Sequence, residues 1–339
     1  MTRMLLAAVV VGVGGGEAVW QWQVQEFGSK ADLRGVSAVS AVVAWVSGTK
    51  GTFGRTVDGG KTWMVGVVAG AEALDFRDVE AFGESTAYLM SAGPAEASRI
   101  YKTTDGGKNW TLQFTNGEAS GFFDSMAFWD EQHGMVLSDP VGGRWYLIAT
   151  EDGGRTWRAL PEAGRPKALE KEGAFAASGT CLAVSGENSA CFCTGGAERG
   201  RVFRSQDRGK SWSAVETPIG AGVESAGAFS IAMRDAEHGI VVGGDYRKPE
   251  GLGPNAAVTR DGGKTWLVSR EPRPFRSGVA WAKDRWVAVG TSGSDVSTDG
   301  GATWKRVDHG NFNAVSFGKN GEGWAVGPKG RVAKWVGEH

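Results

Sequence analysis

One eight-residue pattern recurs six times along the chain and restricts the fold more than any other feature of the sequence. Each copy has Thr or Ser two positions before an aspartate, Gly two positions after it and Trp five positions after it. The aspartates of these Asp boxes are Asp58, Asp105, Asp152, Asp207, Asp261 and Asp299. Their numbers differ by 38 to 55 from one box to the next, the spacing typical of one blade of a β-propeller.

The residue types of the box fit a tight turn between two strands. The aspartate carboxylate can accept hydrogen bonds from backbone N–H groups of its own turn, and Gly adopts the positive φ that follows. The Trp would begin the next strand and pack between neighbouring blades. Because the aspartate recurs in every copy, we interpret it as structural rather than catalytic. Each box contributes a single carboxylate, so we expect no metal site there.

The number of copies of a second repeat gives the number of blades. This repeat is a short apolar strand that ends in a small residue, found at 45–48, 88–91, 135–138, 182–186, 240–243, 286–290 and 324–327. These seven segments, interpreted as second strands, outnumber the boxes by one. Residues 19–27 resemble the stretch after each box, so we expect them to supply the missing outermost strand of blade seven. The sequence therefore predicts an all-β, seven-bladed propeller closed by its N-terminal strand.

The first residues are typical of an export signal. Arg3 precedes an apolar run at 4–13, which is too short to span a bilayer, and Gly16 and Ala18 frame a cleavage site. We expect residues 1–18 to be removed, leaving a propeller at 19–339 with no membrane span, exported to the periplasm or the extracellular space. The alternative is a disordered apolar tail.

Charge and cysteine content exclude several classes of function. With 37 basic and 38 acidic residues, the chain has no global field that would attract nucleic acid. The glycine-rich segment 12–16 follows no strand and has Glu17 where a dinucleotide loop needs its third glycine, so we expect no cofactor. Cys181, Cys191 and Cys193 fit either one cross-strand disulfide or three buried thiols, and no histidine near them suggests zinc.

Three segments carry a resemblance to a known family. Residues 125–134 and 230–239 each lead into an apolar strand and a box, and residues 323–330 form a closing unit. These segments resemble the photosystem II stability/assembly factor family of Asp-box (BNR-type) propellers, including its relatives in non-photosynthetic bacteria. The resemblance implies an exported, non-catalytic propeller that binds other proteins.

The repeat alignment also predicts where a binding site would lie. In a four-stranded blade, the loops that enter strand one and join strands two and three share one face, and the boxes lie on the other. In the repeat alignment, strand one of each blade begins with an aromatic or aliphatic lead residue. In blades one, two, three, five, six and seven, the residue after it is Arg34, Arg77, Asp124, Ser230, Arg276 and Asn313, and blade four is ambiguous near Gly173. Blades six, seven, one and two are neighbours, so three of these residues would bring guanidinium groups together at the channel mouth. Such an arc suits a carboxylate or an acidic peptide. The alternative is that each arginine pairs with a nearby acid such as Asp78 or Asp295.

Loops after strand two add Asp139, Asp245, Tyr246 and Asp295 to the same face. A sialidase-like propeller would need a Tyr–Glu pair, and Tyr246 has no evident glutamate partner. Glycoside hydrolysis with two carboxyl groups stays open through Asp124, Asp139, Asp245 and Asp295, as does carbohydrate binding. We favour a non-catalytic binder of a protein or acidic peptide. Its predicted binding residues are Arg34, Arg77, Asp124, Asp245, Tyr246, Arg276 and Asn313.

Overall fold

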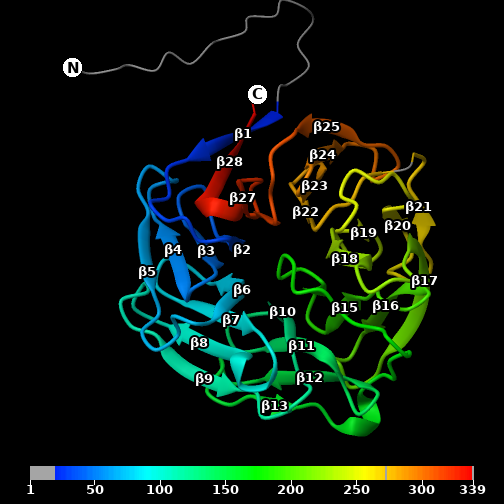
Figure 1. The fold of residues 1–339 in the computed structure, drawn as a ribbon, viewed down its shortest axis with the longest axis horizontal. Coiled ribbons are helices and arrows are strands. Elements are labelled where there is room, and N and C mark those ends of the chain that lie inside the picture. The colour runs from blue at the N-terminus through cyan, green and yellow to red at the C-terminus, as the bar shows by residue number, and fades with distance from the viewer. Residues whose placement is uncertain (1–19, 272, 338–339) are drawn as a thin grey trace, which may run out of the picture.

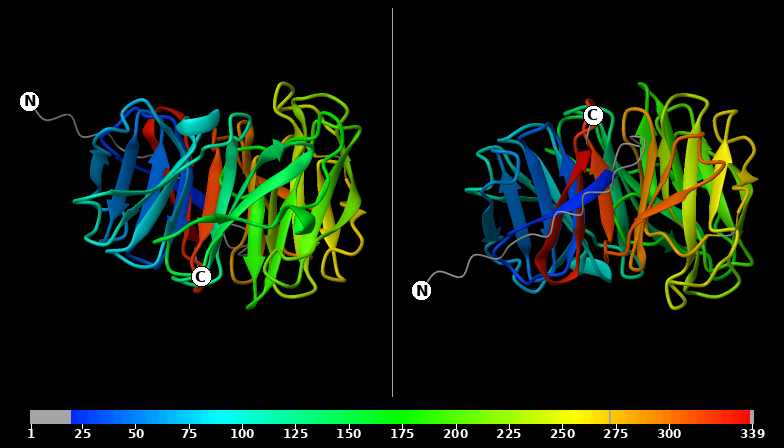
Figure 2. Two further views of the ribbon diagram at one scale, coloured as in Figure 1. Left: turned by 90° about the horizontal axis from the view of Figure 1, so that it is seen from below. Right: turned by 90° about the horizontal axis from the view of Figure 1, so that it is seen from above.

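The computed structural model describes residues 20–271 and 273–337, which form seven four-stranded antiparallel sheets around a central axis (Figure 1). The ring seen from its side shows the turns gathered on two opposite faces (Figure 2). The predicted all-β, seven-bladed propeller is confirmed. The predicted export signal, residues 1–18, lies outside the described residues.

The strands follow the ring in chain order. Blades one and two contain β2 (Leu33–Ala38), β3 (Ala44–Gly48), β4 (Thr52–Thr56), β5 (Met64–Val67), β6 (Asp75–Ala81), β7 (Ala87–Ala92), β8 (Arg99–Thr103) and β9 (Thr111–Thr115). Blades three and four contain β10 (Phe123–Phe128), β11 (Gly134–Val141), β12 (Arg144–Thr150), β13 (Arg158–Ala159), β14 (Leu182–Ser185), β15 (Ser189–Cys193), β16 (Arg199–Ser205) and β17 (Ser213–Gly220). Blades five and six contain β18 (Ala226–Met233), β19 (Gly239–Asp245), β20 (Ala256–Thr259), β21 (Leu267–Val268), β22 (Gly278–Trp281), β23 (Trp286–Gly290), β24 (Gly293–Ser297) and β25 (Lys305–Asp308). Blade seven contains β26 (Ala314–Phe317), β27 (Gly323–Gly327), β28 (Arg331–Gly337) and β1 (Trp20–Gln25).

Helical structure in the described chain consists of three short 3-10 turns. They are η1 (Ala95–Ala97), η2 (Glu162–Gly164) and η3 (Pro328–Gly330). Among the described residues, none of the helices has the length and apolar character needed to cross a bilayer.

Blade seven is completed by the two ends of the described chain. β1 pairs with β28 from Trp20 opposite Gly337 to Gln25 opposite Val332. This pairing confirms that an N-terminal strand closes the ring. The closure covers an edge of β28 that would otherwise present unpaired backbone groups.

The box tryptophans pack between neighbouring blades, as the repeat predicts. Trp63 of blade one meets Trp324 of blade seven edge-on at 5.4 Å between ring centres. Trp110 of blade two meets Trp45 of blade one at 6.1 Å. Burying such large rings contributes much of the apolar stabilisation between blades.

Each box aspartate organises its own turn. At the first box, Asp58 Oδ1 accepts a hydrogen bond from the Thr62 backbone N–H at 2.9 Å, and its Oδ2 accepts one from the Thr62 hydroxyl at 2.6 Å. These bonds from Thr62 lower the pKa of Asp58 to about 2. Gly60 takes φ +87° and donates its N–H to Thr56 Oγ1. The boxes join the third and fourth strands of blades one to six.

The innermost strands of neighbouring blades belong to different sheets, and hydrogen bonds in or beside these strands join each blade to the next. One bond can be chosen at each junction, with a side-chain oxygen at six of them and the Thr180 carbonyl between blades four and five. In order from the junction of blades seven and one, the pairs are Ser316 Oγ with Ala38 N, Ser37 Oγ with Ala81 N, Asp78 Oδ2 with Met126 N, Ser125 Oγ with Leu182 N, Thr180 O with Ile231 N, Ser230 Oγ with Val279 N, and Ser277 Oγ with Asn313 O. We call this set the axial ring.

Blade four departs from the repeat prediction. The segment 182–186, predicted as a second strand, forms β14, the first strand of its sheet. The cause lies in residues 173–180, which form no strand of the sheet and run across the channel (Figure 1). Arg77 Nη1 donates to the Ala176 carbonyl at 2.8 Å, and the Ser178 hydroxyl donates to the Ser277 carbonyl at 2.8 Å. This channel segment, residues 173–180, therefore contacts both blade two and blade six.

The three cysteines are free thiols buried in blade four. Cys193 donates its backbone N–H to the Cys181 carbonyl at 2.9 Å. Burial raises the pKa of all three thiols. The structure thus agrees with the buried-thiol interpretation.

Replacing Trp22 tests how much the closing strand β1 contributes to the free energy of unfolding. It is 8% exposed, its Nε1 donates to Ser294 Oγ of blade six at 3.0 Å, and its ring lies 4.7 Å from that of Trp335. Trp22→Ala should lower the free energy of unfolding by about 3–5 kcal/mol, because a large buried ring is removed. Gln23→Ala, at an exposed position of the same strand, should change it by less than about 0.5 kcal/mol. Urea denaturation measures both, and equal midpoints for the two variants would contradict the expectation.

Candidate functional site

A cavity of about 430 Å³ lies at the channel mouth and draws on all seven blades. The channel segment contributes residues 174–177 to its lining. Arg34 at the start of β2 and Tyr246 after β19 place the cavity on the face opposite the Asp boxes. We call it the central pocket. Its volume is in the range of pockets that hold small molecules or a few side chains.

Two guanidinium groups form the basic side of the central pocket. Arg77 Nε is 2.6 Å from Asp75 Oδ2, and its Nη1 donates to the channel segment. Arg34 Nε is buried and has no hydrogen-bond partner among the described residues. Burial lowers the pKa of Arg34, and the positive charge of Arg77 lowers it further. An anion bound beside Arg34 and Arg77 would offset both the burial of the Arg34 charge and its repulsion by Arg77.

Two carboxyl groups from blade three form the acidic side. Asp124 is 1% exposed, and its Oδ2 is buried without a hydrogen-bond partner in the described structure. Burial raises its pKa well above the usual range, the charge of Asp139 adds to this shift, and Arg77 opposes it. Asp139 Oδ1 accepts the Ala174 N–H at 3.0 Å, and burial raises the pKa of Asp139 to about 6.

Aromatic rings from blades four, five and six form a third side. Phe175 of the channel segment stacks on Phe229 at 3.6 Å between ring centres. Phe275 meets Phe229 edge-on at 4.9 Å. Tyr246 lies 6.2 Å from Phe229 and is 47% exposed. This wall offers apolar contact area at a low cost in conformational entropy.

The structure brings five of the seven predicted binding residues to the central pocket. They are Arg34, Arg77, Asp124, Tyr246 and Asn313. Asn313 is also structural, since its Nδ2 donates to the Leu33 carbonyl at 2.8 Å. Asp245 is not part of the lining, and its Oδ1 accepts the Arg247 backbone N–H at 3.0 Å at the end of β19.

Arg276 does not join the two arginines at the central pocket. It is 2% exposed, and its Nε and Nη2 each lie 2.8 Å from Asp295 Oδ2. Arg273 Nη2 contacts the same oxygen at 2.7 Å. The alternative interpretation, pairing with Asp295, therefore describes Arg276. The repeat alignment misplaced it because Arg276 precedes β22, whereas Arg34 and Arg77 lie within β2 and β6.

The repeat pattern does not reveal the aromatic wall, and the predicted binding set lacks one acid that lines the pocket. Phe229 and Phe275 occupy the lead position of their repeats, which looked like ordinary core. Phe175 lies in the ambiguous part of blade four. Asp139 was recognised on the correct face but was left out of the predicted binding set.

A second hollow of about 500 Å³ adjoins the central pocket. The two share Asp139, Ala174 and Phe175, and the second extends over blade four to Lys171 and Glu224. We call it the outer groove. Together the two hollows provide a path from the channel mouth toward the rim of the same face.

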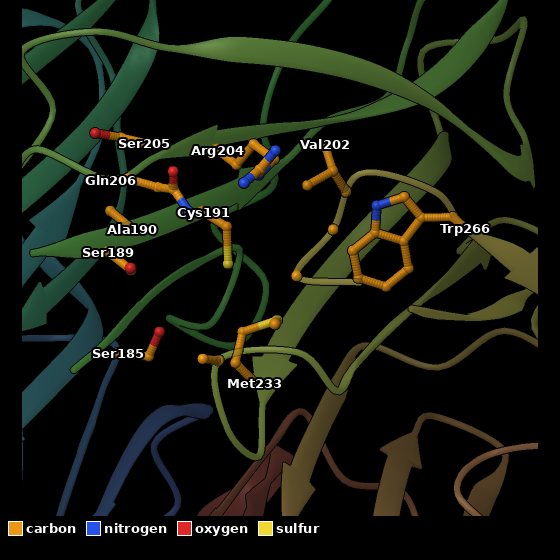
Figure 3. Close-up of a pocket in the computed structure, with 13 residues that line it drawn as sticks. Ser185, Ser189, Ala190, Cys191, Val202, Arg204, Ser205, Gln206, Met233 and Trp266 are labelled. Carbon is orange, nitrogen blue, oxygen red and sulfur yellow. The ribbon is translucent and has the colours of Figure 1, made fainter. Parts of the chain in front are cut away.

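Two other hollows are less suited to a ligand. One lies between blades four and five beside Cys191, Met233 and Trp266 (Figure 3), and its volume of about 30 Å³ has room for little more than water. Another, of about 630 Å³, lies beside Trp20 at blades six and seven. There Arg285 lies 3.5 Å from the ring centre of Trp20, which also stacks on Trp335, so both contacts occupy the aromatic surface.

Within residues 20–271 and 273–337, no group of three or more His, Cys, Asp or Glu side chains is arranged to hold a metal ion. The chemistry of the central pocket is therefore described by its guanidinium, carboxyl and aromatic groups.

Comparison with known proteins relates the chain to solved propellers. No protein-family model and no curated protein matches it. A structure of YCF48 bound to a D1 peptide superposes with a TM-score of 0.67 at 17% identity, covering 93% of this chain and 96% of that one. YCF48 from Cyanidioschyzon merolae gives 0.66 at 18% identity, covering 93% and 98%. The WD40 propeller domain of Doa1 gives 0.61 at 15% identity, covering 93% and 97%. At these identities the likeness shows the fold.

The raised pKa of Asp139 predicts a pH-dependent stability. A carboxyl with a pKa of about 6 in the folded state and about 3.9 when unfolded holds its proton more tightly when folded. Its stabilising contribution is complete below about pH 4 and is lost as pH rises through 6. Relative to Asp139→Asn, the wild-type protein should lose about 2–3 kcal/mol of unfolding free energy between pH 4 and pH 7. Urea denaturation across this range measures the difference, and a constant difference would contradict the assignment.

Proposed function

We propose that this protein is a non-catalytic propeller that binds a partner protein by accepting a peptide segment in the central pocket. The observation that carries the proposal is that Arg34 and Arg77 line one cavity together with an aromatic wall. A rigid ring of seven blades positions these groups before any ligand arrives. Such preorganisation reduces the cost of ordering the site on binding.

The energetics favour a ligand with a carboxylate. Burial and the charge of Arg77 lower the pKa of Arg34, and a ligand carboxylate in the pocket would stabilise both positive charges. Charge-assisted bonds to guanidinium groups are stronger than bonds between neutral groups. The aromatic wall adds apolar contact for a neighbouring side chain.

The fold comparison supports the same class of ligand. YCF48, a propeller of similar architecture, is known in a complex with a D1 peptide. This chain shares that architecture over 93% of its length. By analogy, we propose a peptide segment of a partner protein as the ligand, in an assembly or stability role such as the family resemblance implies.

Burial of the pocket acids supports a binder over a glycoside hydrolase. A hydrolase needs one carboxyl group that reaches the leaving oxygen and one that reaches the sugar ring or a water. Asp124 is 1% exposed, so it has almost no surface to offer a sugar. Asp245 and Asp295, the other acids considered, do not line the pocket.

We further propose that the protein acts outside the cytoplasm. The support is the apolar run at 4–13 followed by the small residues Gly16 and Ala18. Protein recovered from the host should be found in the periplasmic or secreted fraction and should begin near Val19. N-terminal sequencing of the purified protein measures this, and a soluble cytoplasmic form that begins at Met1 or Thr2 would contradict it.

Charge reversal at Arg77 tests the binding proposal. Arg77→Glu should reduce capture of native partners by at least about tenfold, because a repulsive carboxylate replaces an attractive guanidinium. Arg158→Glu is the matched control, since Arg158 is exposed on β13 of blade three. Quantitative pull-downs from the host compare both variants with the wild type, after circular dichroism has shown that each is folded. If the wild type and both variants capture equal amounts of the partners, the binding proposal is wrong.

A further inference from the structure

Two buried polar atoms of opposite character belong to residues that line the same pocket. They are Arg34 Nε, a donor, and Asp124 Oδ2, an acceptor, and neither has a hydrogen-bond partner among the described residues. Buried polar groups in native proteins are almost always paired. These two atoms are enclosed by protein, but their residues show that the pocket has a basic side and an acidic side.

The charges around the central pocket are separated by blade. Arg34 and Arg77 come from blades one and two, and Asp124 and Asp139 come from blade three. Arg77 influences both sides, because its charge lowers the pKa of Arg34 and also that of Asp124. A ligand with only a carboxylate would lie near two acids. A ligand with only a cation would lie near two guanidinium groups.

We propose that the central pocket recognises a peptide segment that carries one acidic and one basic side chain next to an apolar one. The acidic group pairs with Arg34 and Arg77, and the ammonium or guanidinium group pairs with Asp139. The Asp139 side chain is only partly buried, whereas Asp124 is enclosed. The apolar side chain packs on the wall formed by Phe175 and its aromatic neighbours. This inference rests on the proposed function and specifies its ligand.

The dimensions of the site suit such a segment. The central pocket, at about 430 Å³, can hold two or three side chains. The outer groove, at about 500 Å³, shares Asp139, Ala174 and Phe175 with it and lets the backbone leave the mouth. A peptide can thus place three side chains at the centre without being buried end to end.

Asp139 makes the recognition of a basic group dependent on pH. Asp124 and Arg77 lie near Asp139 in the central pocket, and Lys171, Glu172 and Glu224 line the groove beyond it. Glu172 is already paired with Arg201. Because the pKa of Asp139 is about 6, its carboxyl becomes ionised between pH 5 and pH 7. A peptide with a basic residue should therefore bind more tightly as pH rises through 6, and a purely acidic peptide should bind more weakly.

The first experiment uses defined peptides and the full propeller. Fluorescently labelled peptides carry one Glu, one Phe and one Lys in every order, separated by Gly or Ser. Matched sets replace Lys with norleucine or Glu with Gln. Fluorescence anisotropy is recorded at pH 5 and pH 7.5. The tightest members should bind at least about tenfold more tightly than both matched versions, and more tightly at pH 7.5 than at pH 5.

Variants assign the two charges to the two sides. Asp139→Asn keeps an oxygen to accept the Ala174 N–H and should abolish both the preference for Lys and the pH dependence. Arg34→Gln should abolish only the preference for Glu. Glu187→Gln, at an exposed turn between β14 and β15, is the matched control and should leave both preferences unchanged.

The outcomes separate this inference from the proposed function. If peptides bind and Arg77→Glu weakens them, but the norleucine versions bind equally well, paired-charge recognition is overturned and peptide binding stands. If affinity for Lys-containing peptides falls as pH rises, the assignment to Asp139 is overturned. If no peptide binds the wild-type protein, both proposals fail.

Discussion

The axial ring is the constraint on which the rest of the structure depends. Seven innermost strands converge on the axis, and no sheet ladder joins one blade to the next in the described chain. Hydrogen bonds near the axis link the blades instead, and a serine hydroxyl takes part in five of the seven pairs of the axial ring. Short hydroxyl side chains allow backbones to approach closely while keeping buried N–H groups paired. The other two pairs use the Thr180 carbonyl, which accepts the Ile231 N–H, and Asp78, whose two oxygens accept the N–H groups of Met126 and Val79.

The channel segment converts this ring into a site. Without it, the ring would surround a channel, whereas residues 174–177 help to line a pocket. The segment is held by bonds to opposite sides of the ring, through Arg77 in blade two and Ser277 in blade six. Because residues 173–180 form no strand, the innermost position of blade four is occupied by β14, which the repeat pattern predicts as the second strand. The irregular blade and the candidate site thus have the same origin.

The arginine and aspartate side chains on this face form two different arrangements. Around Asp295, the guanidinium groups of Arg273 and Arg276 contact one buried carboxylate, so opposite charges compensate one another within blade six. Removing one partner of such a buried pair is costly. Around the central pocket, Arg34, Arg77 and Asp139 line a cavity, whereas Arg276 and Asp295 do not. The pocket is the better candidate for function because its charged groups face a space that a ligand can enter.

The sequence by itself determined the number of blades and the strand that closes the ring. It could do so because Asp-box turns and alternating apolar strands depend on local backbone geometry, which repeats wherever the residues repeat. It also brought Arg34, Arg77, Asp124, Tyr246 and Asn313 to the pocket lining. Only the tertiary structure decided that Arg276 pairs with Asp295, that Phe175 stacks on Phe229 and that residues 173–180 cross the channel. Those outcomes depend on contacts between residues far apart in the sequence, within blade six for Arg276 and Asp295 and between blades for the other two. Burial and charge pairing decide such contacts, and the repeat pattern does not show which residues will meet.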